Sequence, residues 1–366
     1  MHPEFYTPAH ASAAAVDQTI VPQTTYAPRQ SSGTRERTRE LVEVSPIPRT
    51  DEELIQRITK MLPGPGERPM RVFRSDSFVV VSECDDVWTR ERLWLFDRTY
   101  HQFRAFARKL DVPLSAPAEP LVCVLVTDED RYTAFTRASG DKVASWASGY
   151  YATKSNWVVM YDERTSNDVK EALREIDQHE ASTQQKINQA RRSGRLDEAK
   201  ARQALQHIDD ERKRIKQLAE DNAVKKAIHE CVHLLAFNTG LQPKDRTPPV
   251  WLSEGLATSF ETIQPRSAFG PGLGQKTIAQ KRSSVPMGKA VTLTDPNHIP
   301  TADVDAFYTM SADLFEQLYR TRRPQMRAYF LDIASLPPGT SSEVALRTLF
   351  EKHFGSVDVL ARQLGW

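Results

Sequence analysis

The sequence predicts an α+β protein in which a sheet-containing N-terminal part is followed by a mostly helical C-terminal lobe. Short apolar runs typical of strands occur in the first 165 residues, and apolar residues at helical spacing dominate the remainder. A long, highly charged helical segment lies between these parts and is predicted to be an insertion. The length of 366 residues corresponds to about two domains at roughly 150 residues each.

Overall charge and composition exclude several classes of protein. The chain has 49 Lys and Arg against 48 Asp and Glu, so it lacks the surplus of positive charge that general nucleic-acid binding requires. It contains no glycine-rich phosphate loop and no basic stripe interleaved with aromatic residues. We therefore expect no nucleic-acid partner.

Targeting signals and cysteines leave the cellular compartment open. The sequence has no run of about 18 apolar residues, which predicts no transmembrane helix, and its N-terminus lacks the pattern of a secretory signal. The three cysteines, Cys84, Cys123 and Cys231, form no CxxC pair and no disulfide framework. A cytoplasmic location is the default expectation, and a secreted or periplasmic one follows if the N-terminus is processed or truncated.

The N-terminal region divides into a leader and an α/β part. Residues 1–50 are rich in Pro, Ser, Thr and Ala, which predicts a disordered leader, and residues 51–167 form the N-terminal α/β part of the main domain. The patterns predict helices at Glu52–Met61, Asp86–Leu110 and Glu129–Ala138, and strands at Ser77–Ser82 and Leu121–Thr127. The continuous apolar run of the last of these suits the centre of a sheet.

Two further strand-like runs surround a short polar turn at residues 154–156. They are Gly149–Ala152 and Trp157–Tyr161, and this arrangement predicts a β-hairpin near the edge of the sheet.

Residues 168–222 differ in composition from the rest of the chain. They hold 24 charged residues, 12 acidic and 12 basic, with helical apolar spacing that is interrupted at Ser193-Gly194. We predict two charged helices folded as an antiparallel hairpin, with ion pairs on the solvated faces. The hairpin is either a solvated insertion or a coiled coil that binds a protein partner.

The motif that carries chemistry is His229-Glu230-Cys231-Val232-His233, an HExxH sequence. On a helix the two histidines stand one turn apart on the same face, where both can bind one Zn²⁺. Glu230 is then placed to act as the general base toward a metal-activated water. Asp221 or Asn222 is expected to cap this helix, and Cys231 faces away from the histidines as a small core residue.

Glu254 is the predicted third zinc ligand. It lies 21 residues after His233, within the apolar segment Trp251–Phe260, where a carboxylate needs an ion or a metal as partner. Two histidines, one glutamate and one open position describe a catalytic zinc site, and a structural salt bridge is the alternative role for Glu254. Residues 223–263 are therefore assigned to the zinc-binding helices.

HExxH followed by Trp251-Leu252-Ser253-Glu254-Gly255-Leu256-Ala257 resembles the gluzincin metallopeptidases of the peptidase-MA-like superfamily, and within it a bacterial family of unknown function. The resemblance runs from about Phe78 to the C-terminus. It implies one zinc ion, peptide-bond hydrolysis and a zincin-like fold. In that fold a small twisted mixed sheet carries the active-site helix, and a helical lobe, here residues 264–366, closes the cleft.

The resemblance also implies roles for further residues. His229, His233 and Glu254 match ligands, and Glu230 matches the base. An edge strand that pairs with an extended substrate falls either on Gly149, Tyr150 and Tyr151 or on the strand beginning at Trp157. For the donor to the oxyanion, Tyr308 is the first candidate and His298 is the second. Tyr308 as a plain packing residue is the alternative.

One position departs from the family pattern. Thermolysin-like relatives carry an Asp four residues after the third ligand, where it orients a histidine, and this chain has Thr258 there. The orienting group is expected to be a backbone carbonyl or one of Asp245, Asp303 and Asp305.

Three functions are compatible with the sequence. The first is a zinc metallopeptidase acting on a peptide or protein substrate, which the intact Glu230 favours. The second is a weakly active or inactive binding or scaffold protein of the same fold, acting through the charged hairpin. The third is a zinc amidase, since the same site can hydrolyse other amide bonds.

Overall fold

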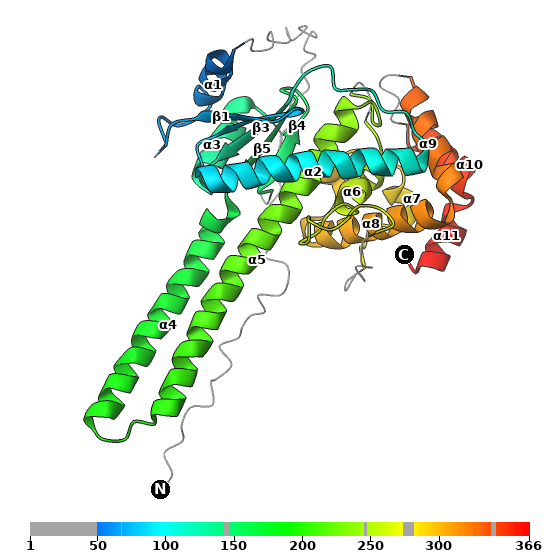
Figure 1. The fold of residues 1–366 in the computed structure, drawn as a ribbon. Coiled ribbons are helices and arrows are strands. Elements are labelled where there is room, and N and C mark those ends of the chain that lie inside the picture. The colour runs from blue at the N-terminus through cyan, green and yellow to red at the C-terminus, as the bar shows by residue number, and fades with distance from the viewer. Residues whose placement is uncertain (1–49, 67, 142–146, 245–246, 274–281, 338–341) are drawn as a thin grey trace, which may run out of the picture.

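The computed structural model describes residues 50–366 except 67, 142–146, 245–246, 274–281 and 338–341. The predicted leader, residues 1–50, lies outside this range apart from Thr50, whose side chain caps the first helix. The fold is α+β, with one small mixed sheet and many helices (Figure 1). The predicted fold class is confirmed at that level.

The sheet has five strands in the order β1-β2-β3-β5-β4. Their bounds are β1 Arg71–Arg74, β2 Phe78–Ser82, β3 Leu121–Val126, β4 Gly149–Ala152 and β5 Trp157–Tyr161. Strands β2, β3 and β5 are parallel, and the two edge strands β1 and β4 are antiparallel to their neighbours. The apolar strand β3 occupies the centre, as its composition predicts.

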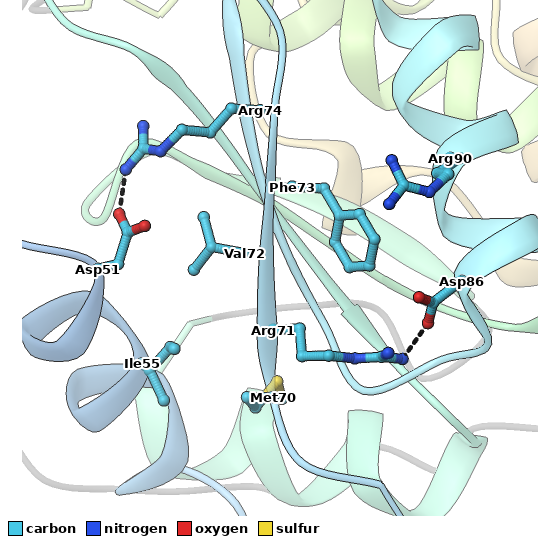
Figure 2. Close-up of a pocket in the computed structure, with 9 residues that line it drawn as sticks. All are labelled: Asp51, Ile55, Met70, Arg71, Val72, Phe73, Arg74, Asp86 and Arg90. Atoms are coloured by element: carbon cyan, nitrogen blue, oxygen red, sulfur yellow. Dashed lines mark hydrogen bonds and ion pairs between the residues drawn. The ribbon is translucent and has the colours of Figure 1, made fainter.

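Strand β1 does not follow from the apolar pattern, because two of its four residues are arginines. Its apolar side chains point to opposite faces, with Val72 toward α1 (Asp51–Thr59) and Phe73 toward the start of α2 (Asp86–Leu110) (Figure 2). The arginines extend to Asp51 and Asp86, which line the same hollow on the outer side of β1. This hollow lies at the opposite edge of the sheet from β4.

Helices cover both faces of the sheet. Helix α2 and the last part of α5 (Glu198–Asn238) pack against the face that carries Phe78, Cys123 and Met160. Helices α1 and α3 (Glu129–Ser139) pack against the face that carries Val124 and Val159. The HExxH motif is therefore held against the sheet by a helix that is buried along its C-terminal third.

The predicted charged hairpin is present and projects from the body of the molecule (Figure 1). Its arms are α4 (Asn167–Arg192) and the first part of α5, and the chain turns between them at residues 193–197. The separate cap predicted at Asp221 or Asn222 is wrong, because α5 runs without interruption for 41 residues through the HExxH motif. Nothing breaks the helix there, since no Gly or Pro occurs between its ends.

The C-terminal part is helical, as predicted. It consists of α6 Val250–Thr258, α7 Met287–Ala290, the 3₁₀ turns η2 Pro296–His298 and η3 Thr301–Asp303, α8 Val304–Thr321, α9 Arg323–Ser335, α10 Glu343–Phe354 and α11 Val357–Leu364. Helix α6 packs closely on α8 at Gly255, where a Cβ would lie 2.5 Å from the carbonyl oxygen of Ser311. This close approach brings Glu254 on α6 near the start of α8.

Within the described part of the chain, no helix combines the length and the apolar character that crossing a bilayer requires. The three cysteines are free and buried. Cys231 faces α2, with its sulfur 3.9 Å from the carbonyl oxygen of Phe96, so its prediction as a core residue is confirmed.

Candidate metal centre

The three predicted ligands meet at one point between α5 and α6. The Nε2 atoms of His229 and His233 are 3.1 Å apart. Glu254 Oε2 lies 3.1 Å from His229 Nε2 and 3.6 Å from His233 Nε2. The three ligand atoms all lie within 4.8 Å of one another, close enough to bind a single metal ion.

The separation of these atoms suits a small tetrahedral cation. Ligand atoms bound at about 2.0–2.1 Å around a tetrahedral zinc ion lie roughly 3.3–3.4 Å from one another. The observed separations of 3.1, 3.1 and 3.6 Å are close to that value. Two imidazole nitrogens and one carboxylate oxygen are also the donor set of many catalytic zinc sites, which keep a fourth position open.

Glu261 orients the first histidine. Its Oε1 lies 2.8 Å from His229 Nδ1 and accepts a hydrogen bond from that N–H group when Nε2 faces the metal position. Glu261 follows the end of α6 and is seven residues beyond Glu254. This hydrogen bond fixes both the rotation of the ring and its tautomer.

The sequence-based expectation for this orienting group is therefore wrong for His229. Asp303 instead accepts hydrogen bonds from Ser283 and from Ser284, and Asp245 lies outside the described residues. Asp305 is exposed on the first turn of α8. Thr258, which stands where thermolysin-like relatives carry an Asp, is half-buried. Its hydroxyl has no hydrogen-bond partner among the residues that the structure describes.

The charges of the site are strongly coupled. Burial acts to lower the pKa of His229, but its hydrogen bonds to Glu254 and Glu261 outweigh this and raise the pKa to about 10. Burial acts to raise the pKa of Glu254, but the neighbouring histidines outweigh it and lower the pKa. Without a cation, His229 therefore retains a positive charge that balances the neighbouring carboxylates.

Glu230 is 6 % exposed and lies next to the edge strand β4. A Cβ added to Gly149 would lie 3.4 Å from Glu230 Cγ and 3.2 Å from Met160 Cβ. Glycine at this position lets the strand approach α5 closely. The predicted general base therefore lies between the metal ligands and the start of β4.

Tyr308 reaches the site from α8. Its ring is parallel to that of His229, with an interplanar angle of 5° and centroids 6.4 Å apart. Burial and the charges of Glu254 and Glu230 raise the pKa of Tyr308 well above its usual value, so its hydroxyl keeps its proton. The other candidate, His298, is exposed in η2, and among the described residues it has no hydrogen bond, ion pair or ring contact with the metal ligands.

The order of strands in the sheet decides which arm of the predicted β-hairpin is the edge strand. Strand β4, with Gly149, Tyr150 and Tyr151, is the edge, whereas β5 lies between β3 and β4. The alternative that placed the edge of the sheet at Trp157 is therefore wrong. Tyr151 stacks on Phe237 of α5, with ring centroids 5.4 Å apart, and Tyr150 is turned to the opposite face of the sheet.

A family model matches a segment of the chain that contains the candidate metal centre. It is described as a protein of unknown function (DUF1570) and matches residues 223–295. That range contains both histidines, Glu230, Glu254 and Glu261. The expected similarity to a family of unknown function is thus confirmed for this segment, which is shorter than the range expected from about Phe78 onward. A search among curated proteins gave no match.

Proposed function

We propose that the protein is a zincin-like, zinc-dependent metallopeptidase of the gluzincin type. The observation that carries the proposal is the arrangement of His229, His233 and Glu254, whose ligand atoms have separations suited to one tetrahedral ion. Glu261 supports it, because metal-binding histidines almost always donate a hydrogen bond from their second ring N–H to such a partner.

The residues around the centre suit hydrolysis of an amide bond. A zinc ion held by His229, His233 and Glu254 would act as a Lewis acid toward the carbonyl and would make a water molecule more acidic. Glu230 is placed to accept a proton from the attacking water and to pass it to the leaving nitrogen. Tyr308, which keeps its proton, is placed to donate a hydrogen bond to the carbonyl oxygen as negative charge develops there.

Strand β4 offers a binding surface for an extended substrate. Among the described residues it is an edge strand, with no strand paired to its outer side, and a Cβ on its first residue, Gly149, would lie 3.4 Å from Glu230 Cγ. A peptide paired with β4 would pass close to the metal ligands. This favours peptides over small amides as substrates.

Substitution of Glu230 tests the proposal. Glu230→Ala removes the base but no ligand, so turnover of peptides from a mixed library should fall by about 100-fold or more while zinc stays bound. Glu198→Ala, an exposed glutamate at the other end of α5, is the control and should retain wild-type cleavage. Loss of zinc from the Glu230 variant would show that its role is misassigned.

The hairpin supports a second candidate function, a scaffold that retains the metal. The 26 residues of α4 span about 39 Å at a rise of 1.5 Å per residue, and most side chains of the hairpin are exposed. Bound zinc without cleavage of any peptide would favour this function, and cleavage of non-peptide amides alone would favour the amidase.

A further inference from the structure

Lys226 lies on the same side of α5 as the candidate metal centre. It precedes Glu230 by one turn and His233 by two, so at about 100° per residue all three point in a similar direction. Its side chain reaches β4, since a Cβ on Gly149 would lie 3.3 Å from Lys226 Cγ. A half-buried lysine therefore stands beside the strand that is proposed to bind substrate.

Among the residues that the structure describes, none has a carboxylate bound to the ammonium of Lys226. Within the described residues it makes no hydrogen bond and no ion pair, and its charge is felt by Glu163 only through space. Glu163 has its own partner, because Ser148 Oγ donates a hydrogen bond to its carboxylate. Burial raises the pKa of Glu163, and the charge of Lys226 acts against that rise.

The direction of a bound substrate follows from two contacts of β4. Gly149, at its start, lies against Lys226 and Glu230, while Tyr151 stacks on Phe237 further along the helix. Strand and helix therefore run in the same direction. Antiparallel pairing is slightly more stable than parallel pairing, so a substrate on the outer edge of β4 runs the opposite way. Its residues after the cleaved bond then lie toward Lys226.

The distance identifies which residue of the substrate reaches the lysine. Lys226 precedes the midpoint between His229 and His233 by five residues, or about 7–8 Å along the helix axis. An extended chain covers that length in about two residues at roughly 3.4 Å each. The second residue after the cleaved bond therefore lies beside Lys226.

We propose that Lys226 determines specificity by binding a carboxylate on the second residue after the cleaved bond. The inference rests on the proposed peptidase function. The carboxylate comes either from an acidic side chain or from the C-terminus of the substrate, and in the second case the product released is a dipeptide. The ammonium would form a charge-assisted hydrogen bond with it, which is among the stronger polar contacts in proteins.

Paired peptides test this assignment. In the first pair, a peptide from the library that is cleaved carries either Glu or Gln as the second residue after the cleaved bond. In the second pair, the peptide ends at this residue, either as a free acid or as an amide. Wild-type protein should prefer at least one carboxylate form by about 10-fold or more in kcat/KM, and Lys226→Met should remove the preference. The neighbouring Lys225→Met points to a different side of the helix and should keep it.

Binding provides a readout independent of turnover. In the Glu230→Ala background, Lys226→Met should weaken binding of the preferred peptide by a similar factor without lowering zinc content. A preference that persists in Lys226→Met, or a wild type that prefers neither carboxylate, would overturn the assignment of Lys226 while the peptidase function stands. A wild type that cleaves no peptide would overturn both. If Lys226 only balances Glu163, Lys226→Met would lower the melting temperature and leave selectivity unchanged.

Discussion

Glu261 shows how a single side chain completes the site. The motif spacing predicts the three ligands, because positions i and i+4 share a helix face whatever the rest of the fold does. It does not predict Glu261, which lies in the turn after α6 and reaches His229 only once α6 has docked on α5 and α8. Thr258, at the position where thermolysin-like relatives carry an Asp, was the available signal that the orienting group comes from elsewhere in the chain.

Removal of Glu261 should weaken zinc binding. Glu261→Ala deletes the acceptor for His229 Nδ1, and loss of such an orienting partner typically costs 10- to 100-fold in metal affinity. Glu261→Gln keeps an acceptor oxygen without the charge and should lower zinc affinity by a smaller factor. Competition with a chelator of known affinity measures the zinc affinity of both variants. Equal zinc affinity in wild type and Glu261→Ala would show that this hydrogen bond does not orient the ligand.

Individual elements differ in how well the sequence predicts them. Helix α2 and strand β3 follow directly from their apolar patterns, because each is long or uniformly buried. Strand β1 is not predicted, since its arginines are stabilised by Asp51 and Asp86, which are distant in the sequence. The continuity of α5 is not predicted either, because capping residues such as Asp221 are tolerated inside a helix when packing favours its extension.

The contribution of the charged hairpin can be tested by removing its outer part. Its base is held by Val169, Ile176, Ile208 and Ile215, which form a small apolar cluster of their own. Replacing residues 178–206 with a short Gly-Ser turn leaves this cluster in place. We expect unchanged zinc content and unchanged cleavage of short peptides, measured by elemental analysis and a peptide assay, because the removed part is solvated. Loss of cleavage with zinc retained would make the distal hairpin part of the catalytic unit.

At the scale of the whole molecule, α5 joins the sheet-containing part and the helical part around the candidate metal centre. One side of the helix packs against the sheet and α2, while its histidines face α6 and Tyr308 of the helical part. The near-neutral net charge of +1 gives no long-range steering. Electrostatic effects are instead local to the coupled carboxylates and histidines and, as we propose, to Lys226.

Zinc content is the most direct test of this account. Protein purified without chelator is measured by elemental analysis beside His229→Ala, with His179→Ala as the control, because His179 is an exposed histidine on α4 that also precedes a glutamate. The account predicts about one zinc per chain in wild type and in the His179 variant, and close to none in His229→Ala. Less than about 0.2 zinc per chain in wild type would contradict it.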